Sequence, residues 1–75
     1  MKEGQSMDKL EMIKVISSNI VAIGHYDNDL YVEFESGTYV YYNVPKAVFT
    51  EMLNAESKGK YMWAHIRGQY EGMRI

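Results

Sequence analysis

The chain has 75 residues, which allows one domain and lies near the smallest size at which a hydrophobic core alone stabilises a fold. It contains no cysteine, so disulfide bonds and thiolate metal sites are excluded and the aromatic residues must supply much of the core. The formal net charge of −2 argues against a strong, generic nucleic-acid binder, and no run is long and apolar enough to span a membrane.

Residues 1–10 are predicted to form a flexible N-terminal tail, because they show no packing pattern. The polar beginning, residues 1–6, lacks the apolar core of a signal peptide. The absence of cysteine agrees with a reducing compartment. We therefore expect a cytoplasmic protein with no membrane partner.

Two β-rich segments open the predicted domain. Residues 12–16 and 20–26 are rich in β-branched side chains, and the polar run Ser17-Ser18-Asn19 between them favours a turn. The sequence leaves open whether the two segments form one bulged strand or two strands. We expect Ser17 and Ser18 to bond backbone groups at the interruption.

Residues 30–35 alternate cleanly and are predicted to form the next strand. One face carries Leu30, Val32 and Phe34. Ser36-Gly37 predicts a two-residue turn, because glycine reaches the positive φ that such turns need. The strand after the turn ends before Pro45, the only proline in the chain.

The predicted turn fixes which tyrosines face the core. The expected cross-strand pairs are Phe34 with Tyr39, Val32 with Tyr41, and Tyr31 with Tyr42. Tyr39 and Tyr41 are therefore first of all core residues. Tyr31 and Tyr42 are expected on the opposite, exposed face, where they are better placed to stack on a ligand.

After Pro45 the apolar residues follow the spacing of an α-helix. The apolar stripe consists of Val44, Val48, Phe49, Met52 and Leu53, on a helix of about ten residues. Ser57 is the expected N-cap of a second short helix, and Gly68 is expected to end that helix. The fold class predicted is α+β: a single domain over residues 11–70, in which an antiparallel three- to four-stranded β-meander is followed by two short helices packed on one face. Residues 71–75 are predicted to be a C-terminal tail.

Several short motifs, in order along the chain, resemble the KTSC domain. They are Ser17-Ser18, Ile23-Gly24, Tyr39-Val40-Tyr41, Asn43-Val44-Pro45, Ser57 to Tyr61, Ile66-Arg67 and Tyr70. The family has no agreed activity, but the module resembles the C-terminal extension of some lysyl-tRNA synthetases and also occurs alone in bacteria and their phages. The resemblance implies a small binding module, with RNA or tRNA as a candidate partner. Its structural motif here is Tyr39, Tyr41, Asn43, Val44 and Pro45.

The basic side chains concentrate near the C-terminal end. Residues 57–75 carry four basic side chains and one acidic one, whereas residues 1–56 carry four basic and nine acidic ones. The candidate RNA contacts are Lys58, Lys60, Trp63, Arg67, Tyr31 and Tyr42. The acidic remainder of the chain favours the alternative, a protein partner or self-association.

The sequence offers no pattern typical of an enzyme or a metal protein. His25 and His65 stand without a clustered carboxylate, so no metal and no other cofactor is expected. Ser17 and Ser18 lack the glycine-rich elbow and the partner residues of a nucleophile. We therefore expect a module without catalytic residues.

Overall fold

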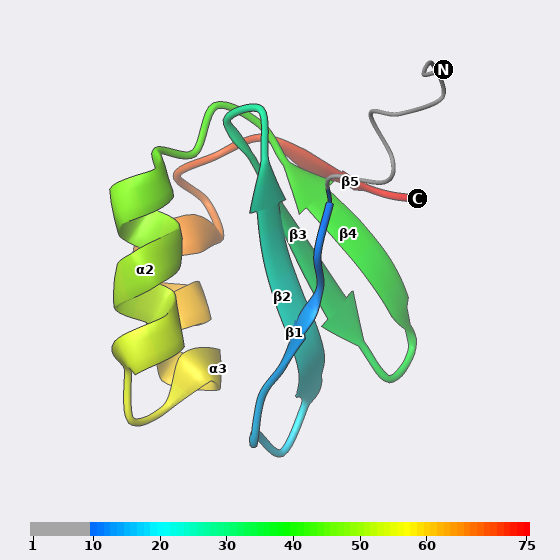
Figure 1. The fold of residues 1–75 in the computed structure, drawn as a ribbon, viewed down its shortest axis with the longest axis vertical. Helices are drawn as coiled ribbons and strands as arrows, with labels where there is room; N and C mark the ends of the chain where they lie inside the picture. Colours follow the sequence, from blue (N-terminus) through cyan, green and yellow to red (C-terminus); the bar gives the residue numbers. More distant parts are fainter. Residues whose placement is uncertain (1–9) are drawn as a thin grey trace.

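The computed structural model describes residues 10–75, which form a five-stranded antiparallel sheet with helices on one side (Figure 1). The strands are β1 (Ile13–Lys14), β2 (Ile20–Tyr26), β3 (Asp29–Phe34), β4 (Gly37–Tyr41) and β5 (Gly72–Arg74), and they lie in sequence order. The helices are α2 (Lys46–Asn54), α3 (Lys58–Tyr61) and the π-helix η1 (Met62–Ile66), which continues α3. The predicted α+β class is confirmed, with five strands in place of three or four. The predicted N-terminal tail lies outside the described residues except for Leu10, which is partly buried.

The polar run after β1 separates two strands, so the alternative of one bulged strand is excluded. β1 and β2 are antiparallel neighbours, and Ile13 lies opposite Ile23. The Oγ atom of Ser17 accepts hydrogen bonds from the backbone N–H groups of Asn19 and Ile20, both at 3.4 Å. The expectation that a serine here satisfies backbone groups is thus confirmed for Ser17.

The register between β3 and β4 differs from the prediction by two residues. The turn is Glu35-Ser36, and Phe34 lies opposite Gly37. The other observed pairs are Val32 with Tyr39, Tyr31 with Val40, and Leu30 with Tyr41. Gly37 has a φ of 152°, so the freedom of glycine is used at the first residue of β4 and not inside the turn.

The shift leaves every side chain on its predicted face, because side chains alternate along a strand with a period of two. Tyr41 is 9% exposed and belongs to the core, and Tyr39 packs against that core. Tyr31 lies on the opposite face, as expected, but across from Val40 and not from Tyr42.

The C-terminal tail predicted for residues 71–75 is wrong, because most of it forms β5. The backbone N–H of Ile75 donates to the carbonyl of Thr38 at 2.8 Å, at the far end of the β4–β5 pair. Gly72 lies opposite Tyr41, and a Cβ atom at Gly72 would stand 2.5 Å from Cδ1 of the Tyr41 ring. A strand of three residues is too short to show an alternating pattern, so β5 could not be predicted from the sequence.

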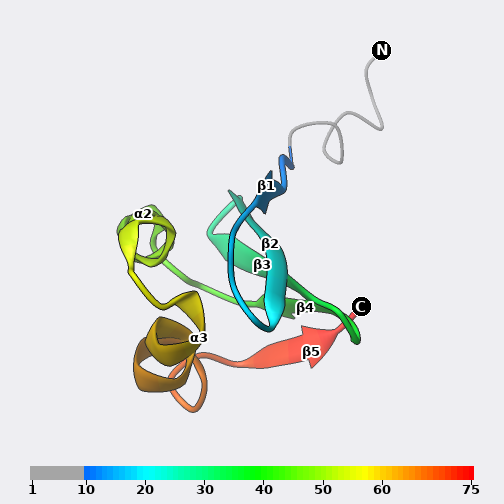
Figure 2. The same cartoon turned by 90° about the horizontal axis from the view of Figure 1, so that it is seen from below.

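The core fills the space between the sheet and the helices. α2 and α3 lie side by side on the same side of the sheet (Figure 2). The most fully buried side chains are Ile20, Ile23, Leu30, Val32, Val44, Met52, Met62 and Ile66. The predicted stripe of α2 is confirmed by the burial of Phe49 and Met52. Ser57 is the N-cap of α3, where its Oγ accepts from the backbone N–H of Lys60 at 3.2 Å.

The segment Asn43-Val44-Pro45 joins β4 to α2 and has a structural role. Val44 is fully buried, and its N–H donates to the carbonyl of Asn28 at 2.7 Å. Its carbonyl accepts from Nε2 of His25 at 2.6 Å. Asn43 adopts a left-handed φ of 58°, and Pro45 occupies the N-cap position with a φ of −61°. This segment therefore ties the β2–β3 hairpin to the start of α2.

Candidate nucleic-acid interface

Two hollows lie beside the β3–β4 turn. The larger, of about 400 Å³, lies where the β1–β2 loop, this turn and α3 meet, at the lower end of the molecule in Figure 1, and the smaller, of about 200 Å³, lies between β4 and Arg67. Phe34, Ser36 and Arg67 line both hollows, so the two adjoin and form one surface region. We call it the aromatic groove, after the side chains that characterise it: Phe34, Tyr39, Tyr41, Trp63 and Arg67.

The guanidinium of Arg67 lies over the ring of Trp63. The Cζ atom is 4.1 Å from the ring centre, and Trp63 is 66% exposed. A cation above an exposed tryptophan contributes about 0.5–1 kcal/mol. The contact therefore holds a positive charge and a flat apolar ring together at the mouth of the larger hollow.

Both residues of this contact come from the π-helix η1 and its C-terminal end. Trp63 lies within η1, and Arg67 is the residue that ends it. The backbone N–H of Arg67 donates to the carbonyl of Met62, five residues earlier, at 2.9 Å. This wider turn is the hydrogen-bond pattern of a π-helix, which in proteins often occurs at functional sites. Met62 and Ile66 are buried, so they anchor η1 on the core while Trp63 remains exposed.

Arg67 also lines the smaller hollow, beside three aromatic rings. Tyr39 stacks on Tyr41 with ring centres 6.5 Å apart, and it meets Phe34 edge to face at 5.7 Å. Burial raises the pKa of the Tyr41 phenol, and the nearby charge of Arg67 opposes that rise. Arg67 is thus the positive charge shared by the aromatic walls of both hollows.

The predicted lysines differ in their roles. Lys58 is partly buried, and its Nζ donates to the carbonyl of Ala55 at 2.9 Å, at the C-terminal end of α2. Such a bond satisfies a carbonyl that the helix leaves unpaired, which gives Lys58 a structural role. Lys60 is exposed and lies three residues before Trp63, so it projects from a neighbouring side of the same helix. The structure therefore brings Trp63 and Arg67 together, with Lys60 about one helical turn before Trp63.

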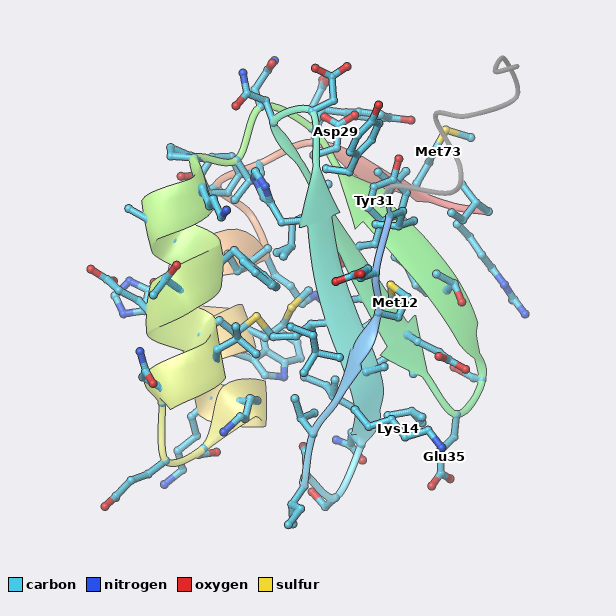
Figure 3. All side chains as sticks on the ribbon, viewed as in Figure 1. Met12, Lys14, Asp29, Tyr31, Glu35 and Met73 are labelled. Carbon is cyan, nitrogen blue, oxygen red and sulfur yellow. The ribbon has the colours of Figure 1, made fainter. Side chains whose placement is uncertain are left out.

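Tyr31 and Tyr42 do not reach the aromatic groove. Tyr31 lies on the face of the sheet opposite the core, at the end of β3 that carries Asp29 (Figure 3). Burial raises the pKa of the Tyr31 phenol, and the charge of Asp29 raises it further. Tyr42 also contributes to this rise, so the two tyrosines are neighbours in an acidic setting. They form a separate surface from Trp63.

Several residues of the groove were not predicted from the sequence. Asn19 comes from the β1–β2 loop, whereas Glu35 and Ser36 come from the β3–β4 turn. The Nη2 atom of Arg74 donates to the carbonyl of Ser36 at 2.7 Å, which ties this turn to β5. The sequence did contain a signal that these two loops lie close together. In an antiparallel meander, the loop after the first strand and the loop after the third strand lie at the same end of the sheet.

Neither histidine belongs to the aromatic groove. His25 bonds the carbonyl of Val44, and the ring of His65 packs on Tyr61 with centres 4.5 Å apart. Within residues 10–75, no three side chains of the metal-binding types gather as a possible ligand set. The helices of this part of the chain are also too short or too polar to cross a membrane.

Comparison with known proteins identifies the family. The model of the KTSC domain matches residues 16–70. The chain belongs to the KTSC domain family. The crystal structure of a KTSC domain protein from Yersinia pestis is 35% identical and has a TM-score of 0.84, and the match covers 88% of this chain and 97% of that one. Comparison with curated proteins gave no match. The resemblance noted in the sequence is thus confirmed for a KTSC domain, and the family assignment brings no activity with it.

Proposed function

We propose that this KTSC domain is a non-catalytic module that binds single-stranded RNA through the aromatic groove and the adjacent Lys60. The observation that carries the proposal is the guanidinium of Arg67 over the exposed ring of Trp63, at the mouth of a hollow of about 400 Å³. Single-strand binders combine aromatic rings, on which bases stack, with cations that contact the phosphates. An unpaired strand offers its bases for such stacking, whereas a duplex keeps them paired.

The charge distribution supports a weak and local contact. The chain has a net charge of −2, so the RNA would be attracted by the surface around Lys60 and Arg67 and not by the whole domain. Lys58 is engaged at the end of α2, and Arg74 is bonded to Ser36. The proposal thus assigns the phosphate contacts to Lys60 and Arg67.

The first test is an NMR titration of the isotope-labelled protein with single-stranded RNA or tRNA at two salt concentrations. Two phosphate contacts predict a slope of about −1.4 in the logarithm of affinity against the logarithm of salt, at about −0.7 per contact. The shifts should centre on Trp63 and Arg67. If no RNA shifts these signals in a salt-dependent way, the proposal is wrong.

Charge-reversal variants locate the contact. Lys60→Glu combined with Arg67→Glu should abolish binding and keep the fold, because both side chains are exposed. Lys46→Glu is the matched control, since Lys46 is an exposed lysine at the start of α2, the end of that helix far from α3 in Figure 1. Equal losses in the double variant and in the control would show a non-specific charge effect.

Trp63→Ala separates stacking from packing. A stacked tryptophan contributes about 1–3 kcal/mol of binding free energy per base. Trp63 is 66% exposed, so its removal should change the free energy of unfolding little. A loss of stability without a loss of RNA binding would assign Trp63 to packing.

A second candidate function is self-association through β5. This strand lies at an edge of the sheet, and within residues 10–75 no strand pairs with its outer side. Met73 and Ile75 are 53% and 63% exposed. Exposed edge strands with apolar side chains readily pair with another strand. Sedimentation velocity over a range of concentrations tests this candidate, and Met73→Glu should abolish any dimer found.

A further inference from the structure

The end of the sheet that carries the β2–β3 loop holds a second group of aromatic side chains, on the face away from the helices. Side chains alternate along a strand, and Leu30 and Val32 are buried in the core, so Asp29 and Tyr31 lie on the outer face. Figure 3 shows both in the upper part of the molecule. Tyr26 lies opposite Asp29 in the register of β2 and β3, and cross-strand partners project to the same side. These three side chains therefore share one face.

The tight β2–β3 loop holds the acidic side chains of this region in place. Asp27 and Asn28 have left-handed φ values of 55° and 66°, which is the conformation of a two-residue hairpin turn. The Oδ1 atom of Asp29 accepts a hydrogen bond from the backbone N–H of Asn43 at 3.3 Å. The Asp29 carboxylate is thus positioned between the hairpin and the segment that follows β4.

The electrostatics of Tyr31 show which groups gather around its phenol. Burial raises the pKa of this phenol, and Asp29, Tyr42, Asp27 and Tyr26 raise it further. No basic side chain of the described residues opposes the rise. Within residues 10–75, three tyrosine rings and two carboxylates therefore lie together without a compensating cation. We call this set, Tyr26, Asp27, Asp29, Tyr31 and Tyr42, the tyrosine–aspartate surface.

The chemistry of this surface disfavours two kinds of ligand and favours a third. Carboxylates repel the phosphates of RNA. In the part of the chain that the structure describes, no three side chains of the metal-binding types gather, so the surface lacks the ligand set of a metal ion. An organic cation, in contrast, is attracted both by the faces of tyrosine rings and by carboxylates.

Among the basic side chains of proteins, arginine meets both requirements best. Its guanidinium is planar, so it can stack on an aromatic ring while its N–H groups bond the oxygens of a carboxylate. A lysine ammonium is a strongly hydrated point charge and lacks this flat surface. The attraction of a cation for an aromatic ring increases where the ring is shielded from water, and Tyr31 is partly buried.

We propose that the tyrosine–aspartate surface binds an arginine side chain of a partner protein, with the guanidinium on the ring of Tyr31 and against the carboxylate of Asp29. The proposal goes beyond RNA binding and does not depend on it. Charge complementarity supports a basic partner, because residues 1–56 carry nine acidic and four basic side chains. The surface lies on the opposite face of the sheet from the aromatic groove, so the two can be occupied together.

The test is an NMR titration of the isotope-labelled protein with three capped peptides of glycine and serine. One contains a single arginine, the second contains lysine in its place, and the third contains citrulline, the neutral analogue of arginine. The arginine peptide should shift the signals of Tyr31 and Asp29 and leave those of Trp63 and Arg67 unchanged. Its affinity should fall as salt rises, and it should exceed that of the lysine peptide. The citrulline peptide should not bind.

Asp27→Asn combined with Asp29→Asn removes both carboxylates. Asparagine tolerates the left-handed φ at residue 27 and keeps an acceptor oxygen at residue 29, so the hairpin should fold. The affinity for the arginine peptide should fall about 2- to 30-fold, the range for two exposed ion pairs. The matched control is Glu35→Gln combined with Glu56→Gln, which removes two exposed charges elsewhere and should keep the affinity. Glu35 lies at the opposite end of β3 from Asp29 in Figure 3.

The aromatic contact is tested by two variants of Tyr31. Tyr31→Leu removes the ring and should lower the affinity for the arginine peptide about 2- to 5-fold, whereas Tyr31→Phe keeps the ring and should keep most of the affinity. This pair also decides the question if the double asparagine variant does not fold. Circular dichroism of each variant verifies folding.

Binding that requires arginine, weakens in the double asparagine variant and persists in the control supports the proposal. The proposal is overturned if the citrulline peptide causes the same shifts, or if the control loses as much affinity as the double asparagine variant. It is also overturned if the arginine peptide leaves Tyr31 and Asp29 unshifted, or if Tyr31→Leu and Tyr31→Phe bind equally well. RNA binding is tested through Trp63 and Arg67, so it stands or falls separately.

Discussion

Gly72→Ala tests how β5 docks on the sheet. The added Cβ would lie 2.5 Å from Cδ1 and 2.7 Å from Cε1 of the Tyr41 ring, where ordinary contacts begin at 3.4 Å. About 0.9 Å of space is thus missing from an ordinary contact. The ring cannot withdraw, because Tyr41 is 9% exposed and part of the core. A glycine covered by the ring of its cross-strand neighbour is a known device for fixing a strand.

The expected cost follows from overpacking, which typically destabilises by about 1–3 kcal/mol. In a domain of this size each kcal/mol lowers the melting temperature by about 4–8 °C. Thermal and urea unfolding measure the loss. Hydrogen exchange of the Ile75 amide, which donates to Thr38, then shows whether β5 has detached.

Gly59→Ala is the matched control. Gly59 lies in the first turn of α3, and a Cβ there would meet nothing within 4 Å. The substitution should stabilise by about 0.4–1 kcal/mol, because it restricts the unfolded chain without straining the fold. A Gly72→Ala variant with the melting temperature of the parent and a protected Ile75 amide would show that the Tyr41 ring tolerates the added methyl group, and would contradict the steric argument.

Three further predictions concern the core, the junction between β4 and α2, and the loss of stability at high pH. Tyr41→Ala should lower the free energy of unfolding by about 3–5 kcal/mol in urea unfolding, and Tyr42→Ala by much less; equal small losses would contradict the assigned faces. Pro45→Ala should cost only about 0.4–1 kcal/mol, because proline acts here mainly on the unfolded chain; a loss of several kcal/mol would show a packing role. Burial, followed by the hydrogen bond to Glu51 at 2.8 Å, raises the pKa of Tyr61 from 10.0 to about 12. The neutral phenol therefore stabilises the fold fully below pH 10, and this stabilisation is lost as pH rises towards 12. When the free energy of unfolding is measured against pH, Tyr61→Phe should lose less stability between pH 10 and 12 than the parent. An equal loss in both proteins would contradict the raised pKa of Tyr61.

Most of the fold could be predicted from the pattern of apolar residues along short stretches of the sequence. The alternation over residues 30–35 and the helical stripe after Pro45 depend on neighbours in the sequence, and both were predicted on the correct faces. The register of the β3–β4 hairpin was missed because a serine-glycine pair fits both a turn and the start of a strand. A shift of two residues changes the partners without changing the faces, so the hydrophobic pattern could not detect the error. β5 was missed because its position depends on a contact between Gly72 and Tyr41, which only the folded chain makes.

The candidate site, like the fold, was predicted from the sequence only in part. Lys60, Trp63 and Arg67 are close in the sequence and were predicted together, and the structure brings Trp63 and Arg67 into contact. Tyr31 and Tyr42 were added because they were expected on the exposed face of the sheet; both are partly buried there, and sharing a face does not bring them to Trp63. Their distance from Trp63 follows from the sheet, since they lie on its other face.

The groove depends on a feature that no local pattern predicts. A regular α-helix would bond the N–H of residue 67 to the carbonyl of residue 63, whereas here the N–H of Arg67 bonds the carbonyl of Met62. That hydrogen bond ends the helix, and the side chain of Arg67 lies over the Trp63 ring. Because Met62 and Ile66 are buried, the position of Arg67 is fixed by the core and not by a flexible loop. A groove built on such a support is preorganised, and a preorganised site loses less entropy when a flexible RNA strand binds.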